Sequence, residues 1–170
     1  MAYYPDLSHY SYFKNDLDAH SLNIGWLDIA YPYTVKPTPA IFAAKLWNFC
    51  RLPVQQSRGF HSCYFCKQPD IGHIEIRDGK ELHLGSAEIR VFGTDGSVYA
   101  APDLIYHYVI AHNYHPPDAF IQAVLEGPQP GTLDYLTLIF LPYINIHKVG
   151  FKPEKDLNRQ VLFQGILQPV

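Results

Sequence analysis

The segment His61-Ser62-Cys63-Tyr64-Phe65-Cys66 holds the residues of this chain that are best suited to chemistry. In a Cys-x-x-Cys turn the two sulfurs point to one centre, at a separation that suits a tetrahedral zinc ion. His61 stands two residues before the first cysteine and can reach the same centre from an extended segment. We therefore predict that His61, Cys63 and Cys66 bind a structural zinc ion.

The fourth ligand must come from a distant part of the chain, because three neighbouring ligands rarely close a structural site. His107 and His112 are the first candidates, on an expected helix. Their spacing corresponds to about 140° around a helix axis, so a straight helix would aim only one of them at the ion. We favour His107, which lies more securely within the helix, and keep His112 as the alternative. His73 and His83, on expected strands, are further alternatives.

The same residues also admit other chemistry. A redox-active Cys-x-x-Cys is expected between a strand and a helix of a βαβ unit, and that context is missing here. Two inert thiols in a loop are the simplest alternative. A catalytic zinc would use His61, Cys63 and Cys66 with an open fourth position, and Glu75 or Glu88 as the base. The chain contains neither HExxH nor the HxE…CxxC pattern of the deaminases, so we favour a non-enzymatic protein and keep a zinc-dependent hydrolase as the alternative.

The third cysteine, Cys50, lies in an amphipathic stretch and is interpreted as a small buried apolar side chain. Three cysteines, two of them in one Cys-x-x-Cys, suit a metal site in a reducing compartment better than a disulfide framework. The N-terminus lacks a basic segment followed by an apolar one, as a secretory signal would have. We therefore expect a cytoplasmic protein.

Several sequence blocks together carry a family resemblance. Residues 58–66 match RGFHxCxxC, and residues 99–125 match YxAPxLIxHYxxxHxYxPPxxFxxAVL. With the shorter blocks IGWLD at 24–28 and AEIRV at 87–91, residues 22–126 resemble a bacterial family of unknown function. The resemblance implies a small soluble bacterial protein. It places both His107 and His112 within the second block, so it does not distinguish between them.

The elements that must position these residues indicate an α+β domain. The apolar spacing in 39–51 predicts a helix that Pro53 ends, and three more helical patterns follow residue 102. Between them, alternating segments in 72–100, with a turn at Asp78-Gly79, predict a small antiparallel sheet of three or four strands. The zinc ion would join the cysteine loop to the junction between sheet and helix.

The length of 170 residues fits a single domain, 1–170. We expect an irregular N-terminal segment over 1–21 and an irregular tail over 150–170. Within the tail, VLFQG at 161–165 matches the core of a picornaviral 3C-type protease site, so part of the tail is a candidate for an engineered addition.

Composition bears on the partners of the chain. A formal net charge of -3 argues against a nucleic-acid partner. We find no stretch of about 20 apolar residues that could span a membrane. The tyrosine cluster Tyr3, Tyr4, Tyr10 and Tyr12 is expected to pack onto the body of the domain rather than to form a binding face. Low charge and many tyrosines suit a protein interface. The leading hypothesis is a zinc-stabilised protein-interaction module, with an immunity-type protein as a special case.

Overall fold

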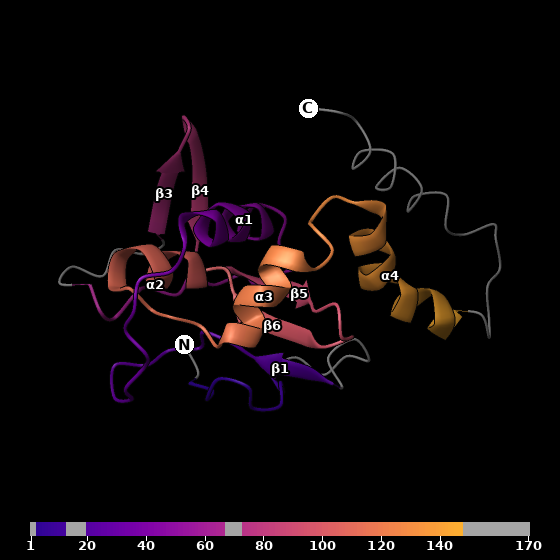
Figure 1. The fold of residues 1–170 in the computed structure, drawn as a ribbon, viewed down its shortest axis with the longest axis horizontal. Helices are drawn as coiled ribbons and strands as arrows, with labels where there is room; N and C mark the ends of the chain where they lie inside the picture. Colours follow the sequence, from indigo (N-terminus) through magenta and orange to yellow (C-terminus); the bar gives the residue numbers. More distant parts are fainter. Residues whose placement is uncertain (1–2, 13–19, 67–72, 148–170) are drawn as a thin grey trace. The chain divides into compact units, whose positions relative to one another are not determined.

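The computed structural model describes residues 3–12, 20–66 and 73–147. Contacts divide the chain into two compact units, Met1–Ile139 and Phe140–Val170, and the first contains both sheets. Its elements follow in chain order (Figure 1): β1 (Ser21–Asn23), α1 (Ala40–Arg51), β2 (Gln55–Gln56), β3 (His73–Arg77), β4 (Lys80–Leu84), β5 (Ala87–Phe92), β6 (Val98–Pro102), α2 (Ile105–His112), α3 (Asp118–Glu126) and the start of α4 (Leu133–His147). The 150–170 tail lies outside the described residues.

The strands form two sheets. One has the order β1-β6-β5-β2, and the other is the hairpin β3-β4. The α+β class and the four helices are as predicted, but the antiparallel sheet differs in two respects: β1 runs parallel to β6, and β3-β4 stands as a sheet of its own. The chain passes from β4 into β5 through Gly85, whose φ of +99° bends the backbone in a way that L side chains rarely allow. This bend separates the hairpin from the larger sheet.

Proline and asparagine set the ends of the helices. Pro39 precedes α1 and Pro117 precedes α3, with extended backbone at both positions. Asn113 ends α2 in the left-handed conformation, with φ of 51°. Because α2 stops at Asn113, His112 is its last helical residue. The predicted helix at 39–51 agrees with α1 to within about one residue, and the three helical patterns predicted after residue 102 correspond to α2, α3 and α4.

The core lies around β5, in which every residue is buried. Aromatic side chains from α1 and α3 cover it, with Phe42 and Phe120 in edge-to-face contact at 6.3 Å. Two polar residues of β5 are buried as well: an Arg90 guanidinium N–H donates to the Glu88 carboxylate at 2.9 Å. The Tyr10 hydroxyl donates to the same carboxylate oxygen at 2.7 Å, and the Arg90 guanidinium lies 4.7 Å from the centre of the Tyr10 ring.

The N-terminal tyrosines pack onto the domain, as predicted. Tyr4, Tyr10 and Tyr12 surround Trp26, with ring centroids 5.2–6.3 Å from the indole. Tyr3 stacks on Tyr31 at 3.8 Å. The aromatic surplus of this segment therefore contributes to packing. Among the described residues, none of the helices combines the length and the apolar character that a bilayer span requires.

The hairpin turns at Asp78 and Gly79, where φ is 52° and 71°, as in the two-residue turns that match strand twist. In β3, His73, Glu75 and Arg77 share one half-buried face, while Ile74 and Ile76 on the other face are 56% and 69% exposed. In β4, Leu82 and Leu84 are buried. The polar face of β3 thus brings a histidine and a carboxylate toward α2.

Candidate metal centre

The cysteine loop is held in place by its contacts with the Gly85 bend. The His61 backbone N–H donates to the Gly85 carbonyl at 2.7 Å, and a Cβ on Gly85 would collide with the His61 carbonyl oxygen. The Asp103 carboxylate fixes the bend by accepting the N–H of Gly85 at 2.8 Å and of Ala87 at 3.1 Å. Glycine is therefore needed at position 85 for the loop to approach so closely.

Phe65, between the two cysteines, docks the loop onto α2. Its ring meets Tyr108 edge-on at 5.7 Å and lies 5.5 Å from the His112 ring. Tyr33 packs against the other side of the loop, at 5.3 Å from Phe65. The Cys63 side chain is consequently fully buried and that of Cys66 half-buried. Both sulfurs lie beside the helix that carries the two candidate histidines.

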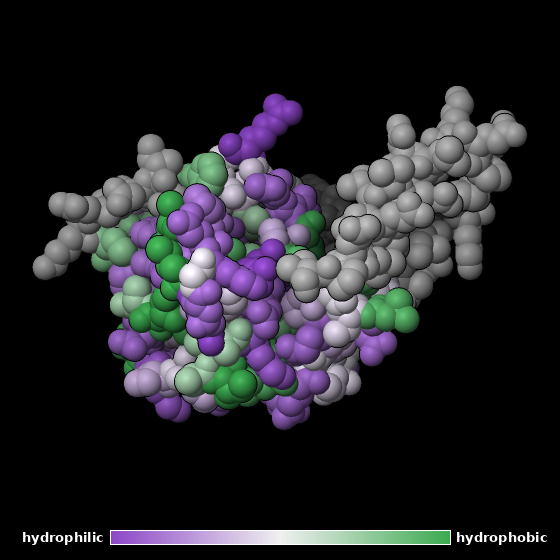
Figure 2. All heavy atoms as spheres, turned by 90° about the horizontal axis from the view of Figure 1, so that it is seen from above, coloured by the Kyte–Doolittle hydropathy of each residue, from purple (hydrophilic) through white to green (hydrophobic). Residues whose placement is uncertain are grey.

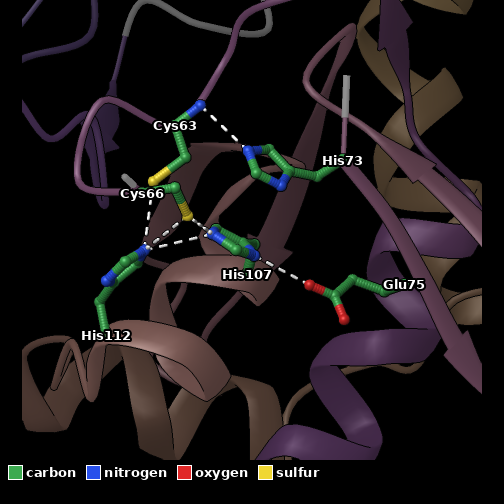
Figure 3. A network of polar contacts seen from close by, with 6 residues as sticks. All are labelled: Cys63, Cys66, His73, Glu75, His107 and His112. Atoms are coloured by element: carbon green, nitrogen blue, oxygen red, sulfur yellow. Dashed lines mark hydrogen bonds and ion pairs between the residues drawn. The ribbon is translucent and has the colours of Figure 1, made fainter. Parts of the chain in front are cut away.

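Four ligand atoms converge at this point (Figure 3). The Cys63 sulfur lies 3.2 Å from His112 Nε2, and the Cys66 sulfur lies 3.3 Å from His107 Nε2 and 3.5 Å from His112 Nε2. The two histidine Nε2 atoms are 3.2 Å apart. A tetrahedral zinc site with ordinary bond lengths has edges of about 3.6 Å between sulfur and nitrogen and about 3.3 Å between nitrogens. The observed separations are close to these edges.

The helix brings both histidines to the centre, where the spacing predicted that only one would reach it. The two rings flank one point beside α2, with centroids 5.1 Å apart and planes at 74°. This is geometrically allowed because each Nε2 is at the far end of a long side chain, and His112 is the terminal residue of the helix. An angular separation at the Cα atoms therefore does not prevent convergence at the ring nitrogens.

His73 is close to the same centre. Ligand atoms of Cys63, Cys66, His73 and His107 all lie within 4.8 Å of one another, so these residues can bind a metal ion. The His73 Nε2 accepts a hydrogen bond from the Cys63 backbone N–H at 3.1 Å. Its ring stacks on His107 at 4.0 Å, with 24° between the planes. In a neutral ring with Nε2 as acceptor, Nδ1 carries the proton, so His73 could bind the ion only by giving up this hydrogen bond.

The remaining predicted ligands lie elsewhere. The His61 side chain lines a small cavity with Trp26, Glu88 and Asp103, and His61 is not one of the residues whose ligand atoms converge. His61 is oriented by its backbone pairing with Gly85, which sequence spacing alone does not reveal. His83 is exposed on the hairpin, 3.8 Å from Glu81.

Glu75 is hydrogen-bonded to His107, one of the converging histidines. Its Oε1 lies 2.8 Å from His107 Nδ1, and the His107 side chain is only 7% exposed. Because a carboxylate only accepts, Nδ1 donates, and the lone pair of a neutral His107 is then on Nε2, the atom beside Cys66. Carboxylates placed in this way orient metal-binding histidines and raise their basicity. Sequence reasoning considered Glu75 only as a catalytic base. The alternation of β3 could have indicated that Glu75 shares a face with His73.

Burial controls protonation at the centre. It raises the pKa of the Cys63 thiol to about 11. It lowers the pKa of His107, although Glu75 acts in the opposite direction, and it also lowers the pKa of His112. Both imidazoles are therefore neutral at pH 7, as metal binding requires. A divalent cation would supply the positive charge that two buried thiolates need.

A sequence comparison now places the chain among known proteins. The profile of a family described as Domain of unknown function (DUF7919) matches residues 2–125. The chain belongs to that family. No curated protein and no solved structure matches it significantly.

The DUF7919 region contains the whole candidate centre. Cys63, Cys66, His73, His107 and His112 all lie between residues 2 and 125, and α4 follows the matched part. The resemblance inferred from the RGFHxCxxC block and the block at 99–125 is thus confirmed as membership of a family of unknown function.

Proposed function

We propose that this DUF7919 protein is a non-enzymatic, zinc-stabilised protein-interaction module of the bacterial cytoplasm, in which Cys63, Cys66, His107 and His112 bind the ion. The observation that carries the proposal is the set of four separations of 3.2–3.5 Å among two sulfurs and two Nε2 atoms. Two sulfur and two nitrogen ligands in a tetrahedral arrangement are typical of zinc. Such a link can contribute about 10 kcal/mol or more of apparent binding free energy to a small domain.

A closed, structural site is favoured over a catalytic one. Four protein ligands leave no position for a zinc-bound water. Two carboxylates are candidates for the base, and both already have hydrogen-bond partners. Glu75 is hydrogen-bonded to His107, and Glu88 is hydrogen-bonded to Arg90 and Tyr10. A zinc-dependent hydrolase, the alternative function, needs an open ligand position and a base that faces it.

Exposed apolar side chains near the centre support the interaction role. Phe60 and Tyr64, in the cysteine loop, are 52% and 55% exposed, and Ile74 and Ile76 project from the hairpin. Seen from above, the described residues show apolar and polar patches side by side (Figure 2). Exposed apolar side chains that form a contiguous patch are characteristic of contact surfaces. The partner would be a protein, and neutralisation of a toxic partner is a special case.

Two matched variants test the ligand set. His112→Phe and His73→Phe each remove one imidazole and keep an aromatic ring. If His112 is the ligand, His112→Phe lowers zinc affinity by more than about 100-fold, whereas His73→Phe, which removes an outer-shell contact, lowers it by about 10–100-fold. Elemental analysis gives the zinc content of each variant, and competition with a chromophoric chelator gives its zinc affinity. The visible spectrum of the cobalt-loaded protein reports tetrahedral coordination.

The outcomes separate the alternatives. The reverse pattern would assign the fourth position to His73. Zinc bound with three protein ligands and an exchangeable water would favour the hydrolase, and stable wild-type protein that binds no zinc would contradict the proposal. For the interaction role, a partner recovered from the native host should be lost with Ile76→Glu and retained with Glu81→Gln, a control on the same hairpin.

A further inference from the structure

The two strands of the hairpin are attached to the domain in different ways. β4 buries Leu82 and Leu84, so apolar packing holds it. β3 has no buried residue: its inward face consists of His73, Glu75 and Arg77, each half-buried. The position of β3 therefore depends on polar contacts.

Those polar contacts lead to the metal centre. His73 accepts the Cys63 backbone N–H at 3.1 Å and stacks on His107, and Glu75 accepts from His107 at 2.8 Å. The positive charge of Arg77, the third inward residue, acts on Tyr106 of α2 and opposes the burial that raises the pKa of its hydroxyl. Alternate residues of one strand thus touch both elements that provide ligands, the cysteine loop and α2 (Figure 3).

We infer that β3 supplies the outer shell of the metal centre, with Glu75 and His73 as positioning residues, and that occupancy of the centre fixes β3 against α2. This inference rests on the proposed zinc site and assigns it a role beyond stability, the control of the hairpin. Glu75 selects the His107 tautomer whose lone pair is on Nε2, and His73 holds the Cys63 backbone.

The control acts in both directions. When the ion draws Cys63 and His107 together, it fixes the two groups that donate to β3, the Cys63 backbone N–H and the His107 Nδ1–H. Without the ion, the cysteine loop and α2 can move separately. Ile74 and Ile76, on the outward face of β3, are then presented in one position only when the ion is bound. Metal binding and hairpin order are therefore linked, and each must strengthen the other by the same factor.

The first test measures metal affinity. Glu75→Ala should weaken zinc binding about 10–100-fold, and Glu75→Gln, whose amide oxygen still accepts from Nδ1, should recover part of the loss. Glu81→Ala is the matched control, because Glu81 is an exposed glutamate of the same hairpin. Wild-type affinity in Glu75→Ala would overturn the role of Glu75. The visible spectrum of cobalt-loaded Glu75→Gln should stay tetrahedral, since the ligands themselves are unchanged.

The second test uses the wild-type chain and does not depend on a variant that must fold. Amide hydrogen exchange is compared between zinc-depleted and zinc-loaded protein. At a free zinc concentration 100 times the Kd, openings that disrupt the site are suppressed about 100-fold, so amides of β3 should slow by up to that factor. Slowing in α2 and residues 61–66 with unchanged exchange in β3 would overturn the inference and leave the zinc site intact. If the protein binds no zinc, both proposals fail.

Discussion

Two clusters of buried polar side chains in the described domain are completed in opposite ways. In the first, Glu88 accepts from Arg90 at 2.9 Å and from Tyr10 at 2.7 Å, so donors and acceptors of the chain meet each other. In the second, the sulfur of Cys66 and the Nε2 atoms of His107 and His112 converge within 3.5 Å. A thiol is only a weak hydrogen-bond donor, and a cation is the partner that would satisfy all of these lone pairs at once.

The difference teaches how to distinguish a structural polar cluster from a binding site. A cluster around β5 that contains both a guanidinium and a carboxylate pairs opposite charges within the chain. A cluster made of metal-ligand atoms, with a carboxylate behind one histidine, is suited to hold an ion from outside the chain. Variants of the two clusters should therefore respond differently to zinc.

The largest expected effect is at the sulfurs. Cys63→Ser should reduce the zinc content from about one equivalent to near zero and destabilise the domain by several kcal/mol, less than the ~10 kcal/mol typical of a zinc finger, because the domain also has an apolar core. Cys50→Ser is the control, because Cys50 is also buried but lies against Asp103, with its sulfur 3.4 Å from the Asp103 carbonyl oxygen. Elemental analysis and thermal unfolding measure both variants. Full stability and full zinc content in Cys63→Ser would refute the assignment.

The next effect concerns the cluster of Glu88, Arg90 and Tyr10. Arg90→Met leaves the buried Glu88 carboxylate without the guanidinium and should cost about 3–5 kcal/mol in the free energy of unfolding. Zinc content should stay at that of the wild type, because the centre is formed by other elements. Urea unfolding with excess zinc provides the free energy. A loss of zinc in this variant would mean that the two clusters are not independent.

Asp103 gives a pH-dependent prediction. Burial raises its pKa from 3.8 to about 6, so between these values the folded state holds the proton more tightly than the unfolded state. The contribution of Asp103 to stability must therefore fall as the pH rises through about 4 to 6. Relative to Asp103→Asn, the wild type should lose about 1–3 kcal/mol between pH 4 and pH 7. Acid releases zinc from the wild type and from Asp103→Asn alike, so its effect on the free energy of unfolding cancels in the difference between them. A constant difference across this range would contradict the raised pKa.

The smallest effect is expected for Tyr10→Phe. This variant removes the hydroxyl that donates to Glu88 but keeps the ring beneath the Arg90 guanidinium. A hydrogen bond to a charged group contributes about 1.5–3 kcal/mol, and the lower end applies here because Arg90 still pairs with Glu88. Zinc affinity should be unchanged. Chemical denaturation with and without zinc checks both statements, and a zinc-dependent difference would link the N-terminal segment to the centre.

Sequence reasoning reached the α+β class, the helices and both cysteines, because periodicity, prolines and a Cys-x-x-Cys are local signals. It placed His107 correctly beside Cys66 but expected His61 as a neighbour. The position of the His61 side chain depends on the pairing of its backbone with Gly85, a contact between residues far apart in the sequence. The parallel pairing of β1 with β6 is likewise non-local.

The outer shell was not predicted for a related reason. His73 contributes a hydrogen bond to Cys63, and Glu75 contributes one to His107. Both hydrogen bonds depend on how the hairpin packs against α2. Helical spacing was also too strict a criterion for His107 and His112, since it describes Cα directions and the ligand atoms are at the ends of the side chains. Three-dimensional packing supplied what residue types and spacing did not.

X-ray absorption of the zinc-loaded wild-type protein tests the central claim most directly. We expect one zinc ion per chain, with two sulfur ligands at about 2.3 Å and two imidazole nitrogens at about 2.0–2.1 Å. A first shell with a water oxygen in place of one imidazole, or a protein that binds no zinc, would contradict it.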